Sequence, residues 1–240
     1  MGRAEGPRIT RANVPRSVGP VIVLEGHRES VLVCLPGFMI AASSYRALLE
    51  PVAAAGTTVV VPQLYRRGVA VLAGRFSVAR EAAAAADLVR STAAQRRTAS
   101  VVLGGHSRGG QAAWRAAAPL ARDGLPAGVV LVDPVDGEGR APTGPVATAA
   151  PAGFACPMLI IGAGIAGRCA PDGVDHRAFA AAAPQARHVV VRALGHADVR
   201  QGPARSLGRR LCRGSDNPDV GRAACSALVT TFVAECLEHR

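Results

Sequence analysis

Short apolar runs alternate along this chain with Ala-rich segments of helical length. The short runs are rich in β-branched residues, and most are continuously apolar rather than alternating with polar residues. Continuous runs of this kind are typical of strands that are covered on both faces, as in the middle of a parallel sheet. The alternation therefore predicts an α/β fold, with a mostly parallel, twisted sheet and helices on both of its faces.

The pattern also gives the order of the elements. The predicted strands are Val21–Leu24, Ser30–Leu35, Thr57–Pro62, Ser100–Gly104, Gly128–Val132, Met158–Gly162 and His188–Arg192. The predicted helices are Ser44–Ala55, Ser77–Ala94, Gly109–Ala118, Asp175–Ala183 and Ala223–Glu238.

The long connection between the strands predicted at 128–132 and 158–162 is rich in Pro and Gly and has no helical period. We therefore expect no helical cap domain there. A chain of this length can bury one large core, so we expect a single domain over residues 21–240. Residues 1–20 are expected to form a flexible tail.

Composition limits where the protein is found. No apolar run approaches the roughly eighteen residues that a membrane span needs. The basic N-terminus is not followed by an apolar stretch, so it does not resemble a secretory signal peptide. These features predict an intracellular, cytoplasmic protein.

Charge and cysteine content add little to this picture. The net charge is +11, and all 28 basic residues are Arg beside heavy Ala usage, which we interpret as a coding bias. No basic helix face carries interleaved aromatic residues, so no nucleic-acid partner is expected. The six cysteines include no C-x-x-C pair, which argues against zinc and thioredoxin-like chemistry. Spacing leaves open a disulfide among Cys169, Cys212, Cys225 and Cys236.

The strongest chemical signal is the segment from Gly105 to Gly109, which reads G-H-S-R-G. It matches G-x-S-x-G directly after a predicted strand and directly before a predicted helix. A sharp strand-to-helix turn exposes the serine hydroxyl, and the flanking glycines let strand and helix approach closely. This pattern predicts the nucleophile elbow of the α/β-hydrolase fold, with Ser107 as the nucleophile.

A serine hydroxyl needs a general base, which in this fold is a histidine after the last strand. His196 has that position, because it closes the segment HVVVRALGH. The other histidines are expected to be surface or packing residues: His27, His106, His176, His188 and His239.

The acid that orients the base is expected at the end of a late strand. Asp133 ends the apolar run GVVLVD, so its carboxylate should emerge at the same sheet edge as Ser107. Asp136 is the nearest rival. Asp172 and Asp175 would have to reach back from a more distant segment.

Acyl transfer also needs backbone N–H groups that bind the oxyanion. The predicted donors are the amides of Arg108, which follows the nucleophile, and of Phe38 in the Pro36-Gly37-Phe38 segment. Phe38, Met39 and Ile40 give an apolar approach to the serine and are the predicted substrate-binding residues. Because such a triad carries the whole reaction, no metal and no organic cofactor is expected.

Several separated motifs in one order resemble the chlorophyllases, which hydrolyse the phytyl ester of chlorophyll. They are the G-H-S-R-G-G elbow, the segment PGF…SSYRALLEPVAAAGTTVVVPQLY, D-P-V-D-G from Asp133, C-A-P-x-G-V-x-H from Cys169 and G-H-x-D from Gly195. The resemblance implies the α/β-hydrolase fold and a triad of Ser107, Asp133 and His196. It also implies a small-molecule, hydrophobic ester as substrate, which is compatible with peripheral contact with the membranes that carry it.

Two positions depart from the family, which usually has His-Gly at Pro36-Gly37 and commonly Asn at Asp175. Pro-Gly followed by an aromatic residue is also similar to bacterial cutinase-like and polyester hydrolases, whose elbow likewise reads G-H-S-x-G-G. A broad-specificity carboxylesterase or polyester hydrolase is therefore the alternative. A non-catalytic ligand receptor on this fold is disfavoured, because nucleophile, base, acid and oxyanion donors are all present.

Overall fold

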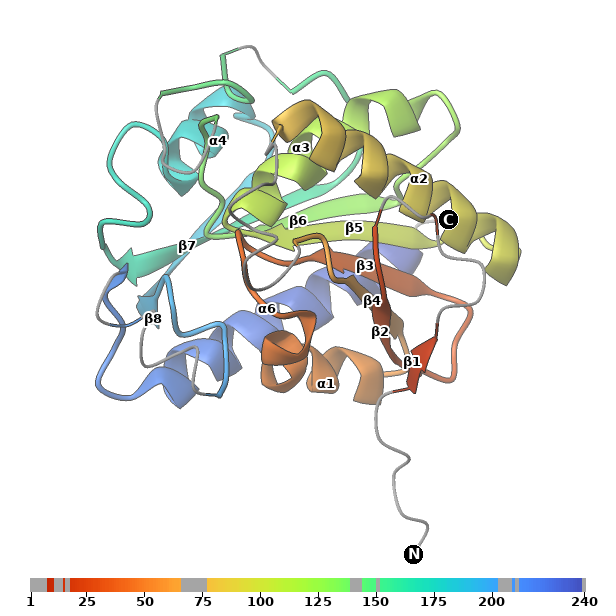
Figure 1. Ribbon diagram of the computed structural model, residues 1–240, viewed down its shortest axis with the longest axis horizontal. Helices are drawn as coiled ribbons and strands as arrows, with labels where there is room; N and C mark the ends of the chain where they lie inside the picture. The colour runs from red at the N-terminus through yellow and green to blue at the C-terminus, as the bar shows by residue number, and fades with distance from the viewer. Residues whose placement is uncertain are drawn as a thin grey trace, which may run out of the picture.

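The chain is described by a computed structural model over residues 8–10, 15, 18–65, 77–138, 144–149, 152–202, 209 and 212–238. An eight-stranded sheet in the order β1-β2-β4-β3-β5-β6-β7-β8 forms its centre (Figure 1). β1 and β2 are antiparallel to their neighbours, and every pairing from β4 to β8 is parallel. The strands are β1 (Arg8–Thr10), β2 (Val21–Leu24), β3 (Val31–Leu35), β4 (Thr58–Pro62), β5 (Val101–His106), β6 (Gly128–Val132), β7 (Met158–Ile165) and β8 (Arg187–Gly195).

The helices cover both faces of this sheet, as predicted. α2, α3 and α4 lie on one face, and α1 and α6 lie on the other (Figure 1). The helical elements are the short 3₁₀ helix η1 (Ala42–Tyr45), α1 (Arg46–Ala54), α2 (Val78–Arg96), α3 (Arg108–Ala121), α4 (His176–Ala182) and α6 (Pro218–Glu238).

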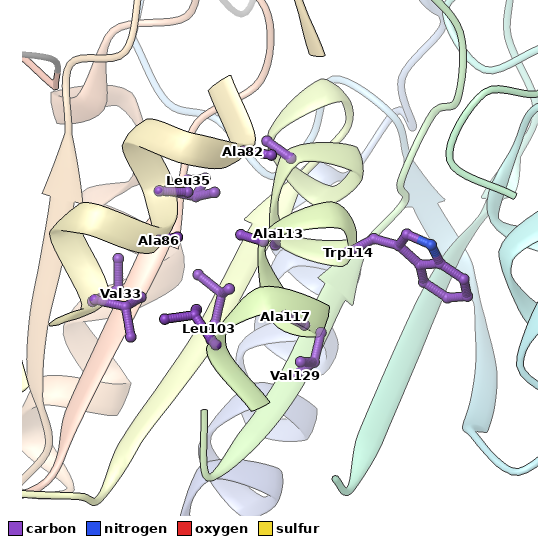
Figure 2. Close-up of a cluster of buried hydrophobic side chains, with 14 of the residues drawn as sticks. Val33, Leu35, Ala82, Ala86, Leu103, Ala113, Trp114, Ala117 and Val129 are labelled. Carbon is purple, nitrogen blue, oxygen red and sulfur yellow. The ribbon is translucent and has the colours of Figure 1, made fainter. Parts of the chain in front are cut away.

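Burial on both faces explains why the central strands are continuously apolar. In β3, Val33 and Leu35 pack with α2 and α3, whereas Leu32 and Cys34 pack with α1 and α6. Figure 2 shows the core under α2 and α3, where alanines such as Ala82 and Ala113 let the two helices lie close to the sheet. Each Leu buried in this way contributes about 1.5–3 kcal/mol relative to an exposed one.

The predicted elements are confirmed, with differences at their ends. β7 and β8 run longer than predicted, and α6 begins at Pro218 rather than at Ala223. Proline suits the first turn of a helix, where its missing N–H has no intrahelical partner to lose.

The expectation of a flexible tail over residues 1–20 is wrong for Arg8–Thr10 and for Val18, which pack against the rest of the fold. Arg8–Thr10 pairs with β2 as an edge strand, with Ile9 opposite Ile22. Val18 is buried against the core. Residues 1–7, 11–14 and 16–17 of the predicted tail lie outside the described residues.

The connection between β6 and β7 contains no helix at residues 133–138, 144–149 or 152–157, in agreement with the expected lack of a cap. Among the described helices, none has the length and apolar character that crossing a membrane requires.

One disulfide joins two segments that follow the carboxyl ends of β7 and β8. Cys169 is bonded to Cys212, whereas Cys34 and Cys225 are buried thiols. The pairing is one of those that spacing left open.

The contact between β5 and α3 gives a test of the fold. A Cβ on Gly105 would lie 2.3 Å from the Gly109 carbonyl oxygen, so Gly105→Ala must push strand and helix apart. We expect the free energy of unfolding in urea to fall by about 1–3 kcal/mol. Gly153→Ala is the matched control, because its nearest neighbour would be the Ala118 Cβ at 3.7 Å. Equal effects of the two substitutions would contradict this account.

Candidate active site

Ser107 lies alone between β5, which ends at His106, and α3, which begins at Arg108. Its backbone has a positive φ of 55° with ψ of −126°, a strained conformation that costs about 1–3 kcal/mol. The Ser107 N–H donates to the Val132 carbonyl at 3.1 Å, which ties the turn to β6. A Cβ on Gly109 would lie 2.3 Å from the Leu35 carbonyl oxygen, so glycine is required for α3 to begin here. These contacts hold the strained turn in place.

The structure brings together the three predicted catalytic side chains, which follow the carboxyl ends of β5, β6 and β8. Ser107 Oγ and His196 Nε2 are 3.1 Å apart, and His196 Nδ1 and Asp133 Oδ2 are 2.6 Å apart. A carboxylate only accepts, so Nδ1 carries the hydrogen and Nε2 is left to accept the serine proton. This is the tautomer that a general base needs.

Asp133 is held as an ionised acceptor in spite of its burial. Burial by itself raises the pKa of this carboxyl. The hydrogen bond and charge of His196, together with the Ala163 N–H, lower the pKa by more than burial raises it. The net result is a pKa below the ordinary value. The Ala163 N–H donates to Oδ1 at 2.9 Å and leaves Oδ2 directed at the imidazole.

Asp136, the nearest rival acid, has a different role. Its carboxylate accepts from the Gln111 side-chain amide at 2.6 Å and from the Thr148 hydroxyl at 2.7 Å. It also accepts the backbone N–H groups of Gly137, Val146, Ala147 and Thr148. These donors account for a pKa below its ordinary value despite burial. Asp136 therefore anchors the 144–149 segment.

The two more distant rivals are also engaged elsewhere. Asp175 is the N-cap of α4, where it accepts the Arg177 N–H, and it pairs with the Arg177 side chain. Asp172 pairs with the same Arg177 at 3.0 Å.

The predicted oxyanion segments lie beside the serine. A turn from Gly37 to Ile40 is closed by the Ile40 N–H, which donates to the Gly37 carbonyl at 3.1 Å. A Cβ on Gly37 would lie 3.3 Å from Ser107 Cβ, so this turn passes directly against the nucleophile. Arg108 is the first residue of α3, where backbone N–H groups point out of the helix end.

The side chains of the two predicted donors, Arg108 and Phe38, are linked by a cluster that sequence reasoning missed. Arg108 forms a buried ion pair with Glu81 at 2.7 Å, and Tyr65 donates to the same carboxylate oxygen at 3.1 Å. The Arg108 guanidinium lies 5.5 Å from the Phe38 ring centroid, and Tyr65 meets that ring edge-on. Burial raises the pKa of Glu81 more than Arg108 lowers it. No local pattern marks Glu81, which lies in the first turn of an Ala-rich helix.

Of the predicted substrate-binding residues, Met39 is the most open. It has a positive φ of 58° and its side chain is 47% exposed, whereas Phe38 and Ile40 are partly buried. The Ile40 carbonyl accepts from the Gln63 side chain at 3.2 Å.

His106 differs from the expectation of a surface or packing residue. It is only 2% exposed, and both of its ring nitrogens are hydrogen-bonded within the site. Its place next to Ser107 in the elbow was the only sequence signal for such a role.

Within the described part of the chain, no group of three or more His, Cys, Asp or Glu side chains is arranged to hold a metal ion.

Comparison with known proteins places this geometry in a family. The family model described as Chlorophyllase matches residues 9–240. The chain belongs to the chlorophyllase family. It is 28% identical to "Chlorophyllase-1, chloroplastic" of Citrus unshiu over 230 residues, covering 86% of this chain and 68% of that protein. The protein of the same name from Citrus sinensis matches equally well.

Solved structures share the fold of this chlorophyllase-family protein. A mutant of the esterase E40 has a TM-score of 0.66 at 20% identity, covering 98% of this chain and 86% of that one. An esterase of the bacterial hormone-sensitive lipase family has a TM-score of 0.64 at 20% identity, covering 97% and 87%. The dienelactone hydrolase of Anabaena variabilis has a TM-score of 0.62 at 17% identity, covering 95% and 98%. The α/β-hydrolase fold is thus confirmed, and with the family it makes the protein a carboxylic ester hydrolase.

Exchange of each rival acid separates their roles. Asp133→Asn should lower kcat on a p-nitrophenyl ester by roughly 10³- to 10⁴-fold, because the amide no longer favours the required His196 tautomer. Asp136→Asn should change kcat only mildly. It should instead lower the free energy of unfolding by about 1–3 kcal/mol, because the donors on one of the two carboxylate oxygens would face an NH₂ group in place of an acceptor. The reverse ranking in kcat would assign the acid to Asp136.

The two depressed carboxyl pKa values also predict acid sensitivity. The folded state favours the ionised forms of the Asp133 and Asp136 side chains. The stability that these carboxylates contribute is therefore fully present above the unfolded pKa of about 3.9. It is lost as the pH falls toward the lower folded values. Urea titrations from pH 6 to pH 3 should therefore show a falling free energy of unfolding, with a smaller fall in Asp136→Asn. Asp172→Asn, whose side chain is 85% exposed, is the control. An unchanged pH dependence in Asp136→Asn would contradict this assignment.

Proposed function

We propose that this chlorophyllase-family protein hydrolyses the phytyl ester of chlorophyll to chlorophyllide and phytol through an acyl-enzyme on Ser107. The observation that carries the proposal is the hydrogen-bonded chain from Ser107 through His196 to Asp133, in a chain that matches the family over residues 9–240. The relatives named chlorophyllase in two citrus species support the choice of substrate.

The chemistry follows from the arrangement of these groups. His196 Nε2 takes the proton of the Ser107 hydroxyl as Oγ attacks the ester carbonyl, and the amides of Phe38 and Arg108 bind the oxyanion. The tetrahedral intermediate collapses, and the departing phytol oxygen takes the proton from His196. Water then repeats the sequence, with His196 as base, and releases the chlorophyllide acid and the free serine. Asp133 stabilises the imidazolium that forms in each half.

Access to the site suits a bulky ester. The described residues between β6 and β7 contain no helix that would cover the serine, and the turn that passes Ser107 at Gly37 also carries the exposed, apolar Met39. Burying a long prenyl chain contributes about 0.8 kcal/mol per CH₂, which supplies binding without specific polar contacts. Peripheral contact with a membrane that carries the ester is part of this proposal.

A second candidate is a broad-specificity or polyester hydrolase that uses the same groups. The Pro36-Gly37-Phe38 segment favours it, because Pro replaces the usual family His and an aromatic residue follows the glycine. The two candidates share the mechanism and differ only in the ester that the site accepts.

A substrate panel distinguishes them. Incubation with detergent-dispersed chlorophyll should release chlorophyllide and phytol, measured by chromatography. Ser107→Ala should be inactive while its circular dichroism is unchanged, because it removes the only covalent acceptor. Cleavage of p-nitrophenyl butyrate or polyester film without chlorophyllide formation would reject chlorophyll and support the second candidate. Ester hydrolysis by Ser107→Ala would reject the mechanism itself.

A further inference from the structure

A buried chain of hydrogen bonds connects the turn at Gly37 to the backbone of the base. The Gly37 N–H donates to the Tyr45 hydroxyl oxygen at 2.8 Å. The Tyr45 oxygen lies 2.7 Å from His106 Nδ1, and His106 Nε2 lies 3.1 Å from the His196 carbonyl oxygen. These hydrogen bonds thus join groups that lie far apart in the sequence.

The partners at the two ends decide where each hydrogen lies. A backbone amide only donates, so the Tyr45 oxygen accepts from Gly37. A carbonyl only accepts, so His106 carries its hydrogen on Nε2 and donates it to His196. Nδ1 of the neutral ring is then an acceptor, and the Tyr45 hydroxyl donates to it. Every member is satisfied in this one arrangement, and a second proton on His106 would leave the Tyr45 hydroxyl hydrogen without that acceptor.

The surroundings keep both side chains in these forms. Tyr45 is fully buried and His106 is 2% exposed. Burial, together with the facing charges of His196 and Arg200, holds the pKa of His106 well below its ordinary value. Burial likewise raises the pKa of Tyr45, against the lowering effect of the Gly37 N–H and Arg200.

This chain of hydrogen bonds contacts three parts of the active site: the oxyanion turn, the nucleophile and the base. Gly37 directly precedes Phe38, whose amide is a proposed oxyanion donor, and His106 directly precedes Ser107. The rings of His106 and His196 also pack at a centroid distance of 4.8 Å. Because a misplacement of about 1 Å costs roughly 10²-fold in rate, a link between these groups has a direct effect on turnover.

We propose that Tyr45 and His106 are positioning residues that set the oxyanion turn and the base relative to Ser107, without contacting the substrate. The inference rests on the proposed ester hydrolysis at Ser107. It extends that function to two residues that neither supply nor accept a proton in the reaction.

The first test removes only the Tyr45 hydroxyl. Tyr45→Phe should lower kcat on a p-nitrophenyl ester by about 10- to 100-fold, with KM changed by no more than about twofold, because transition-state geometry is affected more than binding. Ser226→Ala is the matched control, since its buried hydroxyl donates to the Leu48 carbonyl at 2.7 Å, outside this chain of hydrogen bonds. Its kcat should equal that of the wild type even where its melting temperature falls as far as that of Tyr45→Phe.

The second test asks for rescue at His106. His106→Gln retains an N–H at the end of the side chain that reaches toward the His196 carbonyl, whereas His106→Ala retains nothing. We expect kcat to decrease in the order wild type, His106→Gln, His106→Ala. Equal kcat in the two variants would overturn the role of the donated hydrogen bond.

Nitrogen-15 NMR of the imidazole rings provides a readout that does not depend on activity. In the wild type, His106 should remain neutral with its hydrogen on Nε2 from pH 5 to pH 9. A His106 ring that titrates in this range, or that carries its hydrogen on Nδ1, would overturn the inference.

Wild-type ester turnover with equal kcat in Tyr45→Phe and Ser226→Ala would overturn the inference and leave the proposed function standing. A wild-type protein that cleaves no ester would reject the proposed function and the inference with it.

Discussion

The close approach of α3 to the sheet is the contact on which the site depends. No side chain separates the two, because the Cβ positions of Gly105 and Gly109 are occupied by backbone atoms of α3 and of the β3 end. The helix can therefore begin one residue after β5 ends, which leaves Ser107 at a positive φ. The same approach brings the helix start beside the turn at Gly37, whose missing side chain leaves room for Ser107 and His106. One steric condition thus places both the nucleophile and its predicted oxyanion donors.

The acid depends on support from segments that carry much of the family resemblance. The Asp136 N–H donates to the Val174 carbonyl at 2.8 Å, and Val135 packs with Ala170 and Val174. The D-P-V-D-G and C-A-P-x-G-V-x-H segments therefore contact each other beside Asp133. Apart from Asp133 itself, their contribution is structural: they hold the loop after β6, and the Val135 N–H ties that loop to the Ser107 carbonyl at 3.3 Å.

Two sets of buried polar side chains flank the nucleophile, one built on Arg108 and Glu81 and the other on Tyr45 and His106. Apolar packing is non-directional and orients a reacting atom poorly, whereas a buried hydrogen bond has a defined length and angle. In a region of low dielectric constant such bonds are also costly to break. This physical difference explains why buried polar groups, and not apolar packing alone, hold the residues around Ser107.

The sequence by itself determined the fold class, nearly all of the strands and helices, and the positions of Ser107, His196 and Asp133. These features are local: a run of residues buried on both faces is apolar throughout, and a strand-to-helix elbow needs small residues at fixed spacing. Asp133 was chosen over Asp136 by its place at a strand end and by the family resemblance, and the contacts of Asp136 became visible only with the loop that surrounds it. Equally, nothing near His106 in the sequence indicates that Tyr45 and the His196 carbonyl are its hydrogen-bond partners, because these lie 61 and 90 residues away. Hydrogen-bond partners brought together by strand order are decided by the tertiary structure, since a local pattern carries no information about which distant groups will meet.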